Sequence, residues 1–273
     1  MEVATMTRSI INPKYADWKS LGDYITRLPD SFKHNGRVLW NGRNKIKAFD
    51  LPVKEDEGLQ RVVVVKRFKR LNFVQKLIYI FRTHKARRAY LNGLELVERG
   101  VSTPEPMATV EVKRGCFIEH AYYICGETTL RSIEGETDRD DWNRQLAAAF
   151  ANFVADLHSK GILHNDLNDT NVLYENDENN TYHFSVIDIN RMRFYPVGEN
   201  IPDNECIENL TRFTGRLDLF EFVAREYAKA RNLDADAWVA KSLRQKAQHD
   251  RNWRRRKALL HPIKYLKTIK KHK

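Results

Sequence analysis

A polar loop between two apolar strands constrains the fold of this chain more than any other feature. In the run His164–Tyr174, Asp166 precedes Asn171 by five residues, at the start of an apolar strand. A polar segment rich in turn formers follows, and a second apolar strand ends at Asp188. This pattern predicts a β-hairpin. Antiparallel pairing would bring Asn171 and Asp188 together at one end, with Asp166 on the loop leading into it.

Two carboxylates and an amide oxygen at one point suit Mg²⁺, which prefers oxygen ligands. The spacing is also that of a kinase catalytic loop, and phosphoryl transfer depends on positioning groups and neutralising charge. We therefore predict that Asp166 accepts the proton of an acceptor hydroxyl, and that Asn171 and Asp188 hold the metal on the phosphates. The alternative is a hairpin whose polar residues only cap and turn.

A lysine interrupts an apolar strand about a hundred residues upstream of this loop. The run Val62–Phe68 is a buried-strand pattern with Lys66 near its end. It resembles the third strand of a kinase small lobe, whose lysine contacts the α- and β-phosphates of ATP. Lys66 is therefore the predicted phosphate ligand. The alternative is an edge-strand lysine that discourages aggregation.

The sequence contains no GxGxxG loop to cover the phosphates. Its nearest equivalent is the run Val38–Lys47, which predicts a hairpin with a tight turn at its Asn-Gly pair. Gly42, Arg43 and Asn44 in this turn are candidate contacts for the nucleotide phosphates.

Four stretches of the chain resemble the lipopolysaccharide-core kinase family of the Kdo/WaaP type. They run from Val62 to Phe194 and read "VVVVKRF", "HKARRAYLNGLELVERGVSTPEPMA", "SKGILHNDLNDTNVLY" and "FSVIDINRMRF". The resemblance implies ATP and Mg²⁺ as cosubstrates. It also implies a lipid-linked sugar acceptor in the lipopolysaccharide inner core, above all Kdo on lipid A, at the cytoplasmic face of a bacterial inner membrane.

The resemblance implies an α+β, two-lobed, protein-kinase-like fold. Residues 1–125 would form a small lobe with an antiparallel sheet, a helix over Lys85–Glu98 and a short N-terminal helical extension. Residues 126–273 would form a larger, mainly helical lobe with the catalytic loop, the metal site and a basic tail. Backbone groups near Cys125, at the hinge between the lobes, would hydrogen-bond adenine.

One feature of the family pattern is missing from the predicted helix. The family places an acid near Leu91, where this chain has none. Glu95 lies four residues later, on the same helical face, and is the candidate partner of Lys66. The alternative is that Glu95 is a solvated surface acid. A chain without an acid at Lys66 could be a slow or degraded kinase.

The positive charge of the chain is concentrated in two segments. The net charge is +11, and residues Arg251–Lys273 carry ten Lys and Arg residues and no acid, interleaved with apolar residues. A second basic and apolar segment spans Lys66–Arg88. Such stretches bind anionic membrane surfaces, so we expect the tail to dock on the inner membrane. A solvated tail and nucleic-acid binding are alternatives, the latter the least favoured.

Cysteine usage and hydropathy predict a cytoplasmic protein, peripheral on the inner membrane. The three cysteines lack metal-ligand or redox spacing, which indicates a reducing compartment. Apolar stretches stay below the roughly 20 residues of a membrane span, and residues 1–15 lack the apolar core of a secretion signal. Two other functions stay open: a kinase of another small molecule, such as an aminoglycoside, and a membrane-docked pseudokinase.

Overall fold

The computed structural model describes residues 5–53, 60–137 and 139–260, and the chain divides into two compact units. Unit 1 comprises Met1–Arg131 together with Ser185–Met192, and unit 2 comprises Ser132–Phe184 together with Arg193–Lys273. The sequence suggested one division after residue 125. The contacts instead divide the chain after Arg131 and place the segment 185–192 with unit 1.

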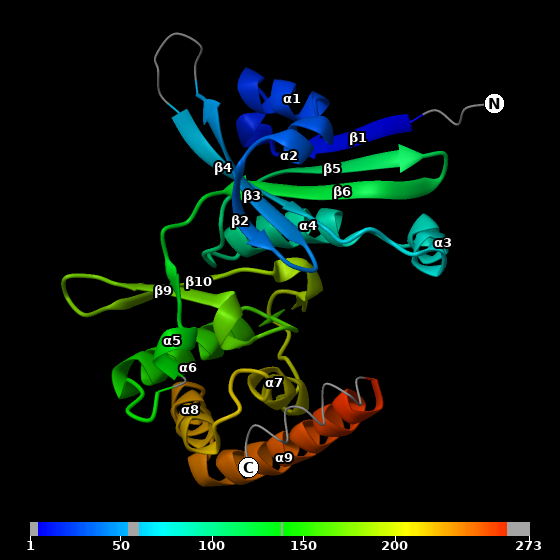
Figure 1. Ribbon diagram of the computed structural model, residues 1–273. Helices are drawn as coiled ribbons and strands as arrows, with labels where there is room; N and C mark the ends of the chain where they lie inside the picture. The colour runs from blue at the N-terminus through cyan, green and yellow to red at the C-terminus, as the bar shows by residue number, and fades with distance from the viewer. Residues whose placement is uncertain (1–4, 54–59, 138, 261–273) are drawn as a thin grey trace. The chain divides into compact units, whose positions relative to one another are not determined.

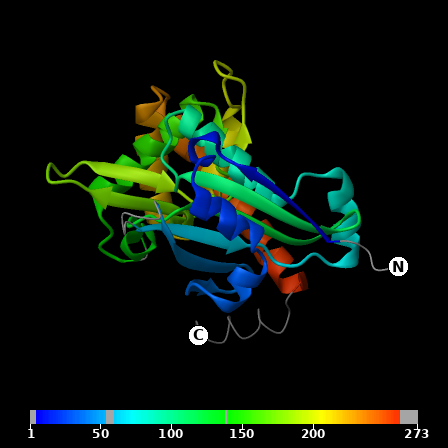
Figure 2. The same cartoon turned by 90° about the horizontal axis from the view of Figure 1, so that it is seen from above.

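Unit 1 is built on a six-stranded sheet of order β1-β5-β6-β4-β3-β2, in which all neighbouring strands are antiparallel (Figure 2). Its strands are β1 (Thr5–Ile11), β2 (Arg37–Asn41), β3 (Lys45–Pro52), β4 (Gln60–Arg67), β5 (Pro106–Arg114) and β6 (Phe117–Gly126). Its helical elements are η1 (Pro13–Tyr15), α1 (Lys19–Thr26), α2 (Asp30–His34), α3 (Phe73–Phe81), α4 (Lys85–Glu98) and η3 (Ile189–Arg191).

Helices cover both faces of this sheet, with α1 and α2 on one side and α4 on the other (Figure 1). Successive residues of a strand point to opposite faces. Val63 and Val65 of β4 are fully buried in the cluster that contains Leu21 of α1 and Phe32 of α2. Lys66 therefore lies on the opposite face, which α4 covers.

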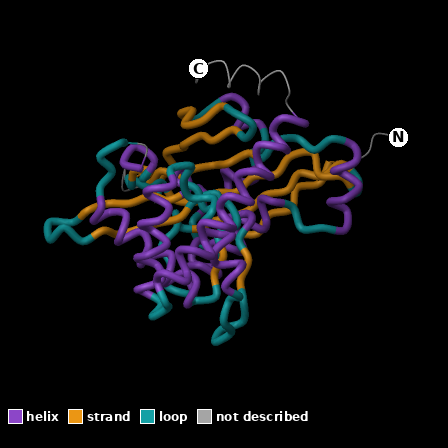
Figure 3. Tube along the Cα trace, turned by 90° about the horizontal axis from the view of Figure 1, so that it is seen from below, coloured by secondary structure: helices purple, strands orange, loops and turns teal. Residues whose placement is uncertain are grey.

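Unit 2 is mainly helical (Figure 3). Its helices are α5 (Glu134–Thr137), α6 (Arg144–Ser159), α7 (Asp203–Leu210), α8 (Leu217–Ala230) and α9 (Ala235–Leu260), with the short turn η2 (Asp169–Asn171). Its short strands are β8 (Ile162–Leu163), β9 (Val172–Asn176) and β11 (Arg193–Phe194). Strands β7 (Arg131–Ser132) and β10 (Tyr182–Val186) cross the division, since Arg131 and Ser185–Val186 belong to unit 1. The core forms where α8 packs against α6 and α9. Phe150 of α6 stacks on Phe213 with ring centroids 4.0 Å apart.

The predicted α+β class is confirmed, and so are the hairpins of β2 with β3 and of β9 with β10. The predicted helix over Lys85–Glu98 has the bounds of α4. Two elements were not expected. Strand β1 pairs with β5 at the start of the segment where we expected a short helical extension, which α1 and α2 supply further along. Helix α9 runs to Leu260, so its last turns contain the first residues of the stretch that we read only as a basic tail. Tail residues 261–273 lie outside the described residues.

Within the described residues, no helix is both long enough and apolar enough to cross a membrane.

Candidate active site

An ion pair in unit 1 joins two of the predicted site residues. Lys66 Nζ donates to Asp188 Oδ1 at 2.7 Å, and the two side chains are only 16% and 32% exposed. Asp188 has left-handed backbone angles, φ 54° and ψ 41°. Few residues other than glycine adopt this conformation, and those that do are concentrated at functional sites, where the surrounding structure holds them in place. The conformation supports the expectation that Asp188 is a site residue, and its role stays a prediction.

Three hydrogen bonds anchor the backbone around Asp188 to unit 1. Val186 N–H donates to the Ser102 carbonyl at 3.1 Å, and Thr103 Oγ1 donates to the Val186 carbonyl at 2.8 Å. Beyond Asp188, Asn92 Nδ2 of α4 donates to the Ile189 carbonyl at 2.7 Å. These bonds flank Asp188 on both sides, so they explain why the segment 185–192 belongs to unit 1 and what holds the left-handed residue.

A second side chain also contacts the Asp188 carboxylate. Asn190 Nδ2 donates to Asp188 Oδ1 at 2.6 Å, so this oxygen accepts from both Asn190 and Lys66. We did not single out Asn190 from the sequence as a site residue. The available signal was its position two residues after Asp188, where most kinases carry a glycine.

Positive charge collects around Lys85 in unit 1, within electrostatic reach of Asp188. The pKa of Lys85, at the start of α4, is lowered first by burial and then by the positive charges of Arg43 and Arg191, while Asp188 raises it. Arg43 comes from the turn between β2 and β3, and Arg191 from η3. The fold therefore gathers cations from distant parts of the sequence, of which we predicted Arg43 and missed Lys85 and Arg191.

The turn between β2 and β3 is held by its own hydrogen bonds. Gly42 N–H donates to the Asn44 carbonyl at 3.2 Å, and Asn44 Oδ1 accepts from the Lys69 N–H at 3.1 Å. A Cβ at Gly42 would lie 2.5 Å from Nε1 of Trp40, so a glycine lets that ring lie over the turn. Contact of Gly42, Arg43 and Asn44 with phosphates stays a prediction.

Glu95 has a different partner from the one we considered. Its Oε1 lies 2.6 Å from Arg99 NH2, one turn further along α4. Side chains four residues apart on a helix are neighbours, so Arg99 is within easy reach of Glu95. Lys66 instead pairs with Asp188. Asp188 thus occupies the position beside Lys66 that we had considered for Glu95.

Cys125 lies in β6, with its side chain buried. Burial raises the pKa of its thiol to about 12, so this cysteine is a packing residue. The next two N–H groups of the chain already donate: Gly126 to the Glu105 carbonyl at 2.9 Å, and Glu127 to the Val62 carbonyl at 3.4 Å. The predicted contact of adenine with backbone near Cys125 must therefore use other groups of this segment, and it stays a prediction.

The predicted catalytic loop in unit 2 is a tight turn closed by two asparagines. Asn171 Nδ2 donates to the Asp166 carbonyl at 2.9 Å, and Asn171 N–H donates to Asn168 Oδ1 at 3.1 Å. Asn168 Oδ1 also accepts from Thr170 Oγ1 at 2.6 Å. Because the amide nitrogen of Asn171 is engaged, its Oδ1 is the atom suited to a cation. The predicted meeting of Asn171 with Asp188, which belongs to the other unit, stays a prediction.

A buried hydrogen-bond network supports this loop from the core of unit 2. Asn209 Nδ2 donates to the His164 carbonyl at 2.7 Å, so Asn209 Oδ1 accepts from His158 Nε2 at 3.0 Å. The other ring nitrogen, His158 Nδ1, then accepts from the Tyr227 hydroxyl at 2.8 Å. His164 is itself buried, and its Nδ1 accepts from the Asp166 N–H at 3.3 Å. His164 therefore supports the loop from within the core, and sequence reasoning missed Asn209 and His158.

Comparison with known proteins then identifies the family. The family model described as the lipopolysaccharide kinase (Kdo/WaaP) family matches residues 68–229, more than half of the chain. This chain belongs to the lipopolysaccharide kinase (Kdo/WaaP) family. The matched range contains Asp166, Asn171 and Asp188 and begins two residues after Lys66. Membership makes the chain a phosphotransferase of the lipopolysaccharide kinase type. A separate comparison with curated proteins found no match.

One solved structure supports the fold expected of a Kdo/WaaP-family kinase, and a second was compared. The structure described as WaaP in complex with acyl carrier protein superposes with a TM-score of 0.55 at 18% identity, covering 88% of this chain and 98% of that chain. The Rio2 kinase–ADP/Mg²⁺–phosphoaspartate complex from Chaetomium thermophilum has a TM-score of 0.45 at 15% identity, covering 89% and 82% of the two chains. The predicted protein-kinase-like fold is thereby confirmed by the WaaP match.

The hydrogen-bond network behind the predicted catalytic loop makes the stability of the folded protein depend on pH. Burial lowers the pKa of His158 to about 4, although its bond to Asn209 opposes the shift. The unfolded chain takes up a proton on this histidine below about pH 6.5, whereas the folded chain does so only below about pH 4. Stability should therefore be lost as the pH falls from about 6.5 to about 4.

The expected share of His158 in this loss is on the order of 3 kcal/mol, because one pKa unit corresponds to about 1.4 kcal/mol. His84, whose pKa burial also lowers to about 4, should add a comparable loss. Urea unfolding between pH 7.5 and pH 4 measures the free energy. The His158→Gln variant should lose less stability over this interval than the native protein, and an equal loss would contradict the assignment.

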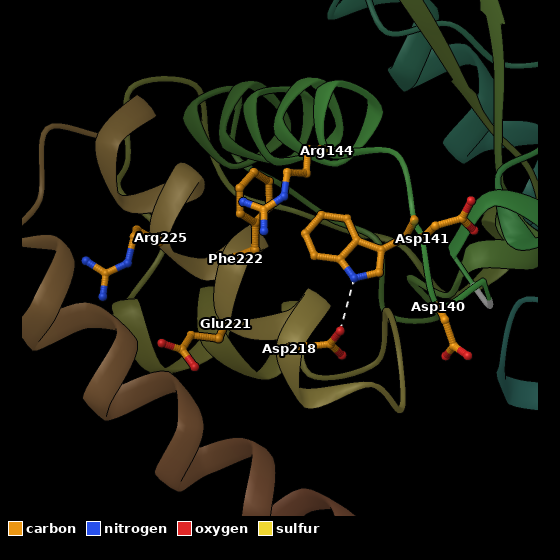
Figure 4. A pocket seen from close by; sticks show the side chains of 8 residues that line it. Asp140, Asp141, Arg144, Asp218, Glu221, Phe222 and Arg225 are labelled. Carbon is orange, nitrogen blue, oxygen red and sulfur yellow. Dashed lines mark hydrogen bonds between the residues drawn. The ribbon is translucent and has the colours of Figure 1, made fainter.

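A hollow of about 590 Å³ elsewhere in unit 2 contains none of the predicted site residues (Figure 4). Its lining comprises Asp140, Asp141, Trp142, Arg144, Asp218, Glu221, Phe222 and Arg225. Much of its charge is already paired. Arg216 binds both Asp140 and Asp218, and Trp142 Nε1 donates to Asp218 at 3.0 Å. We assign this hollow no part in phosphoryl transfer.

Proposed function

We propose that this protein transfers the γ-phosphate of ATP to a sugar hydroxyl of the lipopolysaccharide inner core, with Kdo on lipid A as the preferred acceptor. The observation that carries the proposal is the family match over residues 68–229, which includes Asp166, Asn171 and Asp188. The ion pair of Lys66 with the left-handed Asp188 supports it from geometry.

The side chains of unit 1 suit a nucleotide bound through its phosphates. Lys66 lies at Asp188, and Arg43, Lys85 and Arg191 add positive charge nearby. Cations in this number suit a triphosphate, whose negative charge they would neutralise. Lys66 would hold the α- and β-phosphates, and Arg43 would cover them from the turn between β2 and β3.

The donor set also fits Mg²⁺, a cation that takes oxygen ligands. Asp188 offers carboxylate oxygens, and Asn171 offers its amide oxygen because its nitrogen is bonded to the Asp166 carbonyl. These two residues would hold the ion. When bound, Mg²⁺ would neutralise charge on the phosphate oxygens during transfer.

Asp166 is the proposed catalytic residue for the acceptor. Its backbone is fixed at both groups, since the N–H donates to His164 Nδ1 and the carbonyl accepts from Asn171. Its carboxylate would orient the sugar hydroxyl and take its proton as the oxygen attacks phosphorus. The buried Asn209 and His158 would keep this loop in place without touching the substrate.

The acceptor places the proposed reaction at the cytoplasmic face of a bacterial inner membrane. In α9, the side chains of Arg251, Arg254, Arg255 and Arg256 are exposed. Residues 261–273, outside the described residues, add five more Lys residues. Each basic residue near an anionic leaflet contributes about 1 kcal/mol of attraction. A peripheral kinase on this surface would be concentrated with its lipid-linked acceptor.

The test measures ATP consumption by the purified protein with Mg²⁺, with and without a Kdo-bearing lipid A precursor, and uses Asp188→Ala as the blank. We expect turnover that depends on this lipid and disappears in the variant. Turnover with an aminoglycoside but not with the lipid would point to a small-molecule kinase. Lipid binding without any ATP consumption would point to a pseudokinase.

A further inference from the structure

Helix α3 is exposed on its apolar side. None of its nine residues is buried, and its apolar side chains are exposed to solvent, with Phe81 at 89%. The exposed apolar residues are Phe73, Val74, Leu77, Ile78, Ile80 and Phe81. Of these, Val74, Leu77, Ile78 and Phe81 have the spacing of a single helical stripe, which we call the α3 apolar face.

The side of α3 that contacts the protein is the more polar one. Lys76 is partly buried and forms an ion pair with Glu119 of β6. Tyr79 packs on His84 with ring centroids 5.0 Å apart. The usual arrangement of a surface helix, apolar side inward and polar side outward, is therefore reversed. Such a reversed helix indicates a surface that another partner covers.

Local interactions position α3 although it has no buried core of its own. Asn72 and Gln75 form a reciprocal capping box at its start. Phe73 lies against Phe117 of β6, with ring centroids 6.4 Å apart. A helix this short is not stable in water by itself, so the cap and the contacts with β6 are what hold the α3 apolar face outward.

The charge around α3 indicates what covers it. From Lys66 to Arg88 the chain has nine Lys and Arg residues and no acid. Lys69, Arg70 and Arg82 at the two ends of α3 are exposed. Lys113 and Arg114 are the last residues of β5. They lie next to Phe117, at the start of β6, the strand that α3 contacts. A second copy of this chain, with a net charge of +11, would bring like charge to the same surface, which opposes docking.

We propose that the α3 apolar face inserts into the interface of an anionic lipid bilayer, with the flanking lysines and arginines on the phosphate headgroups. The apolar side chains match the acyl chains just below the bilayer surface, and the basic residues at the two ends of α3 match the anionic headgroups. This proposal rests on the proposed function and extends it. Docking through unit 1 would bring the kinase to its lipid-linked acceptor. It differs from docking through the basic tail, which belongs to unit 2.

The test is vesicle flotation of the full-length protein without ATP. It compares vesicles of phosphatidylglycerol and phosphatidylcholine with vesicles of phosphatidylcholine alone. The variant Ile78→Glu/Phe81→Glu removes two apolar side chains from α3 and adds two charges. The control Val197→Glu/Leu217→Glu makes the same change at two exposed apolar residues of unit 2; Val197 is 88% exposed. All four positions are exposed, so both variants should fold, which circular dichroism would verify.

We expect the native protein and the control to bind the anionic vesicles and the α3 variant to bind at least about tenfold more weakly, since two large apolar side chains of the face would no longer enter the lipid. Equal binding of the two variants would overturn the proposal. It would also be overturned if ultracentrifugation showed a dimer that only the α3 variant dissociates.

This test and that of the proposed function can fail separately. Vesicle binding is measured without nucleotide, and phosphate transfer is measured on detergent-dispersed acceptor without vesicles. If the native protein binds vesicles through α3 but transfers no phosphate, the kinase proposal fails and the docking proposal stands. If transfer proceeds and the α3 variant binds like the native protein, the docking proposal fails alone.

Discussion

Replacing Asp166 with asparagine is expected to lower kcat by about three orders of magnitude and to leave ATP affinity nearly unchanged. The amide keeps the size of the side chain but cannot take the proton of the acceptor hydroxyl, and positioned general bases contribute roughly 10²–10⁴ in rate. ATP affinity should persist because we assign the phosphates to Lys66 and the metal to Asn171 and Asp188. Steady-state kinetics and calorimetric titration with ATP measure the two quantities separately.

Asp169 provides the matched control for this experiment. It lies three residues further along the same loop, and its carboxylate accepts from Thr137 Oγ1 at 3.2 Å and from the Thr170 N–H at 2.9 Å. Asp169→Asn removes the same charge. Its amide oxygen can still accept from the Thr170 N–H, and its amide nitrogen can donate to Thr137 Oγ1 in place of the other bond, so kcat should fall less than about tenfold. If the two variants lose activity equally, or if Asp166→Asn also loses ATP affinity, the role of Asp166 is wrong.

The secondary structure was predictable wherever an apolar repeat agrees with the packing. Strand β4 and helix α4 appear where their patterns place them, because one buried face dictates the spacing of their residues. Strand β1 was missed because most of its residues are exposed. It forms by pairing with β5 at the edge of the sheet. Backbone hydrogen bonds to β5 need no particular side chains, so the sequence of β1 shows no clear apolar repeat.

The site was predictable residue by residue but not contact by contact. The spacing of Asp166, Asn171 and Asp188 is a local motif and can be read along the chain. The partner of Lys66 is not local, since Asp188 lies 122 residues away, and a helical pattern pointed to Glu95 instead. Asn209 was missed because a single buried asparagine resembles any other polar residue until its bonds to His164 and His158 are seen.

The second large expected effect concerns the ion pair of Lys66 with Asp188, whose two members we assign to phosphate and metal binding. Lys66→Met should weaken ATP binding at least about tenfold and lower kcat further, because a hydrogen bond to a charged group is worth about 1.5–3 kcal/mol. Asp188→Asn should instead raise the Mg²⁺ concentration needed for half-maximal activity, since an amide is a weaker ligand for this ion than a carboxylate. The two variants thus separate binding of phosphate from binding of metal.

Lys76 is the matched control, a lysine of the same unit that is 22% exposed and paired with Glu119. Lys76→Met removes an ion pair of similar burial that has no place in the proposed phosphate site. If loss of a buried ion pair alone explained the effect, Lys76→Met would weaken ATP binding as much as Lys66→Met does. We expect its ATP affinity to stay within about twofold of the native value, because an ion pair of this exposure contributes about 1 kcal/mol at most and acts on stability. A weakening confined to Lys66→Met would then identify this lysine as the cation on the phosphates, whereas native affinity in Lys66→Met would leave it a structural partner of Asp188.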